Sequence, residues 1–262
     1  MWKSLQRILL WFYQRYFIYQ LSRSSTKVPK LPSTMAFIVD GNRRYAKQNG
    51  ISYDQSYDIA GKKVFRVAEY CREYKIKNCI VWLMSISNFS RPSEEVDILM
   101  NVFERFYNWD TGYTKNLHDQ NCSIHFIGDF SVIPEKYKSL KETFRICVEK
   151  TKHNTGTRFI TAIGYDGQNE LTRVCNEIAP TFAVKGTATF SFDEINRSTD
   201  LAKLNVDPPD IIVRTGGNKR LSNFLNWDSG KSSLYFINKQ FPAFEKLDFV
   251  QALLSWKKDQ NT

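Results

Sequence analysis

Arginine side chains and a single aspartate follow two short apolar runs that lie far apart in the chain. The first run, residues 36–39, precedes Asp40 and the arginine pair at 43–44, and the second, residues 210–213, precedes Arg214. Guanidinium groups bind phosphate oxygens as a bidentate fork, and a carboxylate among them can hold Mg²⁺ against the same phosphates. The two segments therefore predict binding of two diphosphate groups and one divalent metal ion.

The first cluster has the residue types that diphosphate binding needs. Gly41 would let the backbone approach a ligand closely, and a helix that starts at Asn42 would point free amide N–H groups at a phosphate. Arg43 and Arg44 would bind the phosphate oxygens, and Asp40 would hold the metal ion. The alternative interpretation is an ordinary turn with two solvated arginines.

The second cluster repeats this chemistry on a loop that contains two glycines. Arg214 leaves the strand end, and Gly216 and Gly217 permit close approach of a ligand. Arg220 and Ser222 then add a charged fork and a hydroxyl group. The alternative is a surface loop in which Ser222 caps a helix.

A third loop, residues 84–92, also follows an apolar run and ends in Arg91 and Pro92. Three arginine-bearing loops at strand ends favour a shared anion-binding site over three unrelated turns. The chain has no Walker A motif and no dinucleotide-binding glycine fingerprint, which argues against the common nucleotide-binding folds.

Alternating strand and helix patterns indicate how these loops are positioned. Apolar runs predict strands at 36–39, 78–85, 123–127, 157–163, 210–213 and 233–237. Helical spacing predicts a helix that follows Gly41 and Asn42 and runs through Lys47, and a helix that follows residues 164–167 and runs through about 178. It also predicts helices that span 59–75, 93–118 and 134–152. The expected fold is a single α/β domain: a mostly parallel six-stranded sheet flanked by helices, with an additional N-terminal amphipathic helix. Such sheets bind ligands beyond the carboxyl ends of their strands.

The start of the predicted 93–118 helix has a recognisable pattern. Ser93 is the candidate N-cap, and Glu94, Glu95 and Asp97 are acids that favour a helix's first turn.

Length and cysteine usage limit the class of protein. At 262 residues the chain suits one domain, and it has no linker-like stretch or internal repeat. Its five cysteines form no Cys-x-x-Cys pair, which favours reduced thiols in a cytosolic environment. The three histidines have no metal-ligand spacing, so a zinc site is not expected.

Basic residues are concentrated near the N-terminus. The net charge is +10, and residues 1–47 hold nine Lys and Arg against one acid. Aromatic, aliphatic and basic side chains are interleaved there, with no apolar stretch near the roughly 20 residues that span a bilayer. The pattern predicts a basic amphipathic arm, residues 1–30, on a membrane surface, followed by a domain at 31–262. The alternative is a helix packed on its own domain or on a partner subunit.

Four motifs, in order, resemble those of the cis-prenyltransferases, the family of undecaprenyl and dehydrodolichyl diphosphate synthases. They are residues 40–47 (DGNRRYAK), 85–92 (SISNFSRP), 164–167 (GYDG) and 214–225 (RTGGNKRLSNFL). The arginine pair at 43–44 is similar to the eukaryotic dolichol-type branch. The resemblance implies an enzyme that adds isopentenyl diphosphate in cis to an allylic diphosphate such as farnesyl diphosphate. It implies Mg²⁺ as the cofactor and long-chain polyprenyl (dehydrodolichyl) diphosphate for glycosylation lipid carriers as the product.

The same resemblance implies roles for individual residues. Asp40 would be the catalytic metal-site acid, with Asn88 and Ser85 near the reacting carbons. The residues implied for the allylic diphosphate are Gly41, Asn42, Arg43, Arg44 and Arg91. Those implied for isopentenyl diphosphate are Arg214, Arg220 and Ser222. The growing chain would lie between the sheet and the helices near 59–75 and 93–118, where Leu99, Phe103 and Phe106 fit either a tunnel lining or an ordinary core.

Several positions depart from the family pattern. The usual Gly-His-x-Ala-Gly reads YDIAG at 57–61, and Ser87, Asn218 and Ser233 stand where glutamates are usual. A C-terminal Arg-x-Gly motif, which in the family reaches across the dimer, is not found. The resemblance therefore implies a heteromer with an accessory subunit similar to the Nogo-B receptor family, peripheral to the cytoplasmic face of the endoplasmic reticulum membrane.

Two other functions fit parts of the sequence. A non-catalytic accessory subunit would be expected to lose the cluster at 40–44 and keep the C-terminal motif, which is the reverse of the pattern here. A nucleic-acid-binding protein would use the basic arm and show steep salt dependence. Because it leaves the three arginine loops without a role, no nucleic acid partner is expected.

Overall fold

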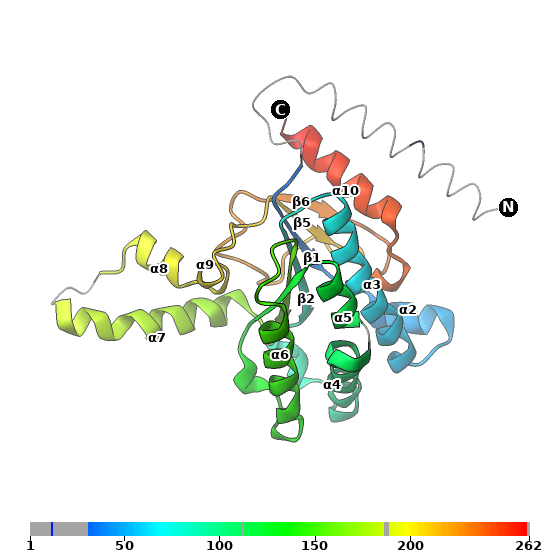
Figure 1. Ribbon diagram of the computed structural model, residues 1–262, viewed down its shortest axis with the longest axis horizontal. Coiled ribbons are helices and arrows are strands. Elements are labelled where there is room, and N and C mark those ends of the chain that lie inside the picture. Colours follow the sequence, from blue (N-terminus) through cyan, green and yellow to red (C-terminus); the bar gives the residue numbers. More distant parts are fainter. Residues whose placement is uncertain (1–11, 13–30, 112, 186–188, 261–262) are drawn as a thin grey trace.

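The computed structural model describes residue 12 and residues 31–111, 113–185 and 189–260. Within these ranges six strands form one parallel sheet with helices packed around it (Figure 1). The strands are β1 (Thr34–Ile38), β2 (Asn78–Met84), β3 (Ser123–Ile127), β4 (Arg158–Ile163), β5 (Ile211–Arg214) and β6 (Ser233–Phe236). The predicted single α/β domain is confirmed, and its sheet is wholly parallel.

The order of the strands creates a switch point in the sheet. The order is β3-β4-β2-β1-β5-β6, so β1 pairs with β2 on one side and with β5 on the other. In open α/β sheets, ligands bind beyond the carboxyl ends of the strands at such a reversal. The three arginine-bearing loops leave from β1, β2 and β5, and the sheet therefore brings them to one place.

Helices and short 3-10 turns connect the strands. The α-helices are α2 (Asn42–Asn49), α3 (Tyr53–Glu73), α4 (Ser93–Tyr107), α5 (Tyr113–Asp119), α6 (Lys138–Thr151), α7 (Gly167–Lys185), α8 (Phe192–Ser198), α9 (Asp200–Lys203) and α10 (Lys246–Asp259). The 3-10 turns are η1 (Ile86–Ser90), η2 (Trp109–Thr111), η3 (Phe130–Val132), η4 (Glu135–Tyr137) and η5 (Phe241–Ala243). Figure 1 shows α7 and α8 extending to one side, with α9 next to α8 and the helices α2 to α6 and α10 farther away.

Both faces of the sheet are buried, as its continuous apolar strands require. In β1, Met35 and Phe37 belong to the larger core, which includes side chains of α3, α4, α6 and α10. Ala36 and Ile38 belong to a smaller core on the other face, together with residues of α9 and of the turn at 221–225. The alternation follows from the two-residue period of a strand.

The predicted helix at 93–118 is wrong in its length and in its cap. The side chain of Asn108 accepts a hydrogen bond from the backbone N–H of Asp110 (2.9 Å), a local turn that competes with the helix and ends α4. Ser93 is the first helical residue rather than the N-cap, because Pro92 occupies the cap position.

The predicted helix at 59–75 begins earlier, at Tyr53. Ser52 and Gln55 form a reciprocal capping box, in which each side chain bonds the other residue's backbone N–H. The extra turn and a half carries Tyr57 into the buried part of α3.

The predicted N-terminal amphipathic helix lies outside the described residues, except for Phe12, which is helical. Among the helices that are described, none combines the length and apolar character needed to cross a membrane. All five cysteines are free thiols, and four of them are buried.

Candidate active site

A polar cleft of ≈ 770 Å³ lies at the carboxyl ends of β1, β2 and β5. It is lined by every predicted site residue except Arg220: Asp40, Gly41, Asn42, Arg43, Arg44, Ser85, Asn88, Arg91, Arg214 and Ser222. Arg220 is exposed, and its Nε donates a hydrogen bond to Oγ of the cleft-lining Ser222 (3.3 Å). The fold thus assembles the residues that the sequence singled out in three separate loops.

Asp40 links the first and second clusters. Its Oδ1 accepts a hydrogen bond from Arg44 Nη2 (3.2 Å). Its Oδ2 accepts from Arg214 Nη2 (3.0 Å) and from Asn218 Nδ2 (2.9 Å). Burial raises the pKa of Asp40, but the hydrogen bonds from Asn218 and Arg214 and the charges of Arg214 and Arg44 outweigh it. The pKa of Asp40 therefore lies below its ordinary value, and the group is a carboxylate at neutral pH.

Arg214 is more buried than the other arginines in the cleft, with 6% of its side chain exposed. Its Nη1 donates to the backbone carbonyl of Arg220 and to Oγ of Ser222 (2.9 Å). Its Nε is buried without a hydrogen-bond partner. Because a buried unsatisfied donor costs about 1–3 kcal/mol, this geometry fits a site that an anionic ligand completes.

Two glycines have backbone conformations that the cleft requires. Gly41 has φ 104°, and a Cβ there would come within 2.9 Å of Cβ of Gln240. Gly216 has φ 83°, and a Cβ there would come within 2.7 Å of Arg44 Nη2. Since Arg44 Nη1 donates to the Gly216 carbonyl (2.5 Å), a larger residue at 216 would displace an arginine of the first cluster.

Glu95 holds the arginine of the third loop. Its Oε1 accepts hydrogen bonds from Arg91 Nη1 (2.7 Å) and from the Tyr57 hydroxyl (2.9 Å). Its Oε2 lies 3.5 Å from Arg43 Nη1. From the sequence, Glu95 was predicted only as an acid in the first turn of a helix. Its i,i+4 spacing from Arg91 is a recognisable signal for the ion pair that was missed. Tyr57 has no comparable local signal.

Ser85 and Asn88 belong to one capped turn beside the cleft. Asn88 Oδ1 accepts a hydrogen bond from the Ser85 backbone N–H (3.2 Å), and the hydroxyls of Ser85 and Ser87 lie 2.9 Å apart. Asp166 and Asn223 belong to two of the sequence motifs, but no role was predicted for either residue. Both also line the cleft, and Asn223 Nδ2 donates a hydrogen bond to Asp166 Oδ2 (3.3 Å).

The described residues contain no group of three His, Cys, Asp or Glu side chains that could hold a metal ion. Mg²⁺ usually keeps several waters and is bound by one or two carboxylates together with substrate phosphates. Asp40 is ionised, lines the cleft and has 28% of its side chain exposed. The site therefore fits a metal that arrives with a diphosphate, and does not fit a cage built from protein ligands alone.

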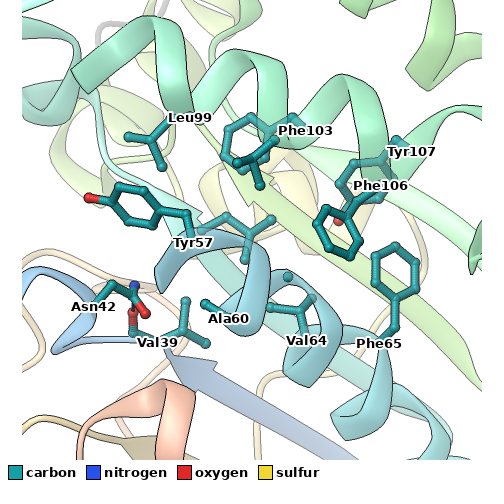
Figure 2. A pocket seen from close by; sticks show the side chains of 13 residues that line it. Val39, Asn42, Tyr57, Ala60, Val64, Phe65, Leu99, Phe103, Phe106 and Tyr107 are labelled. Atoms are coloured by element: carbon teal, nitrogen blue, oxygen red, sulfur yellow. Dashed lines mark hydrogen bonds between the residues drawn. The ribbon is translucent and has the colours of Figure 1, made fainter. Parts of the chain in front are cut away.

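An apolar pocket adjoins the cleft between α3, α4 and the sheet (Figure 2). Leu99, Phe103 and Phe106 line it, and they also belong to the larger core. Its volume is ≈ 40 Å³, well below the roughly 150 Å³ of an apolar cavity that holds one benzene molecule. A prenyl chain could occupy this place only if some of these side chains moved.

Known proteins that are similar to this chain are prenyltransferases and prenyl diphosphate synthases. The family model described as "Putative undecaprenyl diphosphate synthase" matches residues 38–262. An isoprenyl transferase of Thermus thermophilus is 32% identical, over 97% of this chain and 95% of its own. A tritrans,polycis-undecaprenyl-diphosphate synthase (geranylgeranyl-diphosphate specific) of Thermoplasma volcanium is 35% identical, over 89% of each chain. The crystal structure of lavandulyl diphosphate synthase from Lavandula x intermedia, in complex with dimethylallyl diphosphate, has a TM-score of 0.80 and 27% identity, and the match covers 87% of this chain and 95% of that one.

Proposed function

The chain belongs to the cis-prenyltransferase family, and we propose that it condenses isopentenyl diphosphate onto an allylic diphosphate in repeated cis additions. It is an enzyme of the prenyl diphosphate synthase class. One observation carries the proposed reaction: four arginines and the ionised Asp40 line a cleft that opens into an apolar pocket. This combination suits substrates with a diphosphate head and a hydrocarbon tail.

The proposed reaction develops negative charge on the departing diphosphate, and the arginines of the cleft would stabilise that charge. The allylic C–O bond breaks with its electron pair on the diphosphate, the isopentenyl double bond forms the new C–C bond, and a proton is then lost. Arg43, Arg44 and Arg91 would bind the allylic diphosphate, with the backbone of Gly41 and Asn42 beside it. A preorganised donor at developing charge is worth about 3–4 kcal/mol.

The second substrate would bind beside the second cluster. Arg214, Arg220 and Ser222 would hold isopentenyl diphosphate, which would supply an acceptor to the buried Nε of Arg214. Ser85 and Asn88 would lie near the reacting carbons. Asp40 would hold Mg²⁺, which, when bound, would neutralise charge on the departing diphosphate.

Incorporation of radiolabelled isopentenyl diphosphate into solvent-extractable polyprenyl product tests the proposed reaction. We expect incorporation that requires an allylic diphosphate and Mg²⁺ and that EDTA abolishes. Absence of incorporation with dimethylallyl, geranyl, farnesyl and geranylgeranyl diphosphate, in the presence of Mg²⁺ and of the accessory subunit proposed below, would contradict it.

We further propose farnesyl diphosphate as the starter and a long polyprenyl diphosphate, destined for dolichol, as the product. The arginine pair at 43–44, similar to the dolichol-type branch, supports this assignment. Reversed-phase chromatography of the dephosphorylated products decides it, because products only one or two units longer than farnesyl would exclude a dolichol-type enzyme.

We also propose that an accessory subunit resembling the Nogo-B receptor family completes the enzyme at the cytoplasmic face of the endoplasmic reticulum membrane. Ser233 on the edge strand β6 stands at a position where the family usually has a metal-site glutamate. The next residue, Leu234, is 45% exposed, which suits a subunit contact. The basic, aromatic composition of residues 1–30 supports membrane association.

A further inference from the structure

The polar cleft and the apolar pocket meet at a shared boundary, here called the neck. Five residues line both cavities: Val39, Asn42, Tyr57, Leu83 and Leu99. On the proposed function, a substrate with its diphosphate in the cleft and its hydrocarbon in the pocket must cross the neck. The side chains of these five residues therefore limit what can enter.

Tyr57 has the largest side chain in the neck, and it is the one residue of the five that comes from α3. It falls at the first position of the YDIAG segment, where the family pattern has glycine. Figure 2 shows its ring beside Leu99, with the hydroxyl pointing away from Phe103 and Phe106. Tyr57 as a whole is 6% exposed, so its side chain fills space that a glycine would leave open.

Two groups hold the Tyr57 ring by its hydroxyl. The hydroxyl donates to Glu95 Oε1 (2.9 Å) and accepts from Arg91 Nη1 (3.3 Å), and Arg91 also donates to Glu95 (2.7 Å). Burial and the charge of Glu95 raise the pKa of Tyr57, against the opposing effect of Arg91, so the hydroxyl keeps its proton at neutral pH. The ring cannot leave the neck without breaking both of these contacts.

The pocket beyond the neck offers little compensating space. Its volume is ≈ 40 Å³, and the Phe106 ring packs so closely on Gly61 that a Cβ there would lie 2.6 Å from it. A longer hydrocarbon must therefore displace side chains in the pocket in addition to passing the Tyr57 ring. The cost of this displacement rises with chain length, because interiors are close-packed.

We propose that Tyr57 is a specificity-determining residue: its ring, fixed by Glu95 and Arg91, restricts the hydrocarbon of the allylic starter that enters from solution and favours shorter starters over longer ones. The inference rests on the proposed function. It adds a residue that selects among allylic diphosphates by the bulk of their tails.

Binding of two non-cleavable analogues tests this role without requiring turnover. We would measure the Kd values of farnesyl and geranylgeranyl thiolodiphosphate by calorimetry on the full chain, for the wild type, Tyr57→Ala, Tyr57→Phe and Tyr70→Ala. Tyr70 lies on the same helix, α3, packs on Phe249 and lines neither cavity. Tyr57→Ala should shift the Kd ratio at least fivefold toward the longer analogue, Tyr57→Phe should shift it less, and Tyr70→Ala should stay within twofold of the wild type.

The outcomes separate this inference from the proposed function. An unchanged ratio in folded Tyr57→Ala, with both analogues bound, overturns the role of Tyr57 and leaves the proposed function standing. Failure of the wild type to bind either analogue counts against the proposed function itself. If Tyr57→Ala does not fold, Tyr57→Leu replaces it, and the same shift or absence of shift decides.

Discussion

Arg214 Nη2 donates a 3.0 Å hydrogen bond to Oδ2 of Asp40, a residue 174 positions earlier in the chain. Parallel pairing of β1 with β5 sets this contact, because Ile38 and Arg214 are register partners. Asp40 also accepts from Arg44 and Asn218. The two proposed diphosphate sites therefore share one charge network, and a change in either cluster affects the other.

Replacement of Asp40 should stop catalysis and also weaken the fold. Asp40→Ala is expected to abolish Mg²⁺-dependent product formation, because it removes the carboxylate proposed to hold the metal. It also leaves Nη2 of the buried Arg214 without its acceptor, which should lower the free energy of unfolding by about 1–3 kcal/mol. Isopentenyl incorporation and urea denaturation measure the two effects.

Two further variants separate these effects. Asp40→Asn keeps the shape and an acceptor oxygen but not the charge, and should also be inactive while remaining more stable than Asp40→Ala. Asp97→Asn is the control, because Asp97 pairs with Lys136 on the surface and does not line the cleft. Near-normal turnover of folded Asp40→Asn would rule out the metal assignment.

Arginine variants should separate the two substrates. Arg43→Ala is expected to raise the KM for the allylic diphosphate, and Arg220→Ala the KM for isopentenyl diphosphate. Loss of a charged hydrogen bond costs about 1.5–3 kcal/mol, or roughly tenfold to a hundredfold. These two are cleaner tests than Arg44 or Arg214, both of which bond Asp40.

Initial-rate kinetics with each substrate varied in turn would measure these constants. Lys138→Ala on α6, an exposed cation that pairs with Glu135 and lies outside the cleft, is the control. If both arginine variants raised only the allylic KM, the map of two sites would be wrong.

The strands and the positions of the three loops could be predicted from the sequence because each apolar run is continuous and ends in polar residues. This pattern is local. Because ligands bind beyond the carboxyl ends of the strands in such a sheet, the pattern also predicts where the site lies. The end of α4 before Asn108 was not predicted, because helical spacing of apolar residues continues beyond it toward Leu117. The hydrogen bond from the Asp110 backbone N–H to the Asn108 side chain, which ends the helix, has no such periodic signal.

The contacts inside the site could be predicted only in part. Residue types identified Asp40 and the arginines, and the i,i+4 spacing of Asp40 and Arg44 is a local signal for their contact. The contact of Asp40 with Arg214 depends on the strand order, which no local pattern states. The contact between Tyr57 and Glu95 joins residues 38 positions apart on two helices. It could be found only once α3 and α4 had been packed together.

The purified chain should have low activity that rises at least tenfold when the accessory subunit is added. The physical reason is an incomplete site: Asp40 is the one acid within the two arginine clusters, residues 40–44 and 214–222, and Ser233 supplies no carboxylate. Isopentenyl incorporation by the chain with and without a co-purified partner is the measurement. Full activity from a pure homodimer would contradict the heteromer.

Trimming the end of the apolar pocket should lengthen the products. Phe106 lies at the opposite end of the pocket from Tyr57 (Figure 2) and packs on Phe65 and Tyr113. Phe106→Ala should shift the products to longer chains and cost about 3–5 kcal/mol of stability. Phe144→Ala removes an equally buried ring that does not line the pocket, and it should leave product length unchanged. Chromatography showing the same shift in both variants would contradict a specific role for Phe106.

Asp228 should make the fold less stable as the pH rises toward neutrality. It is 7% exposed and its Oδ2 has no hydrogen-bond partner. Burial, reinforced by the charges of Glu170 and Asp200, raises its pKa to about 7, whereas in an unfolded chain it is about 3.9. Between these values the folded state holds a proton that the unfolded state has lost, so stability falls with rising pH and levels off above about 7. Asp228→Asn should match the wild type near pH 4 and exceed its free energy of unfolding at pH 8 by up to about 4 kcal/mol. Urea denaturation with identical pH dependence in both proteins would contradict this assignment.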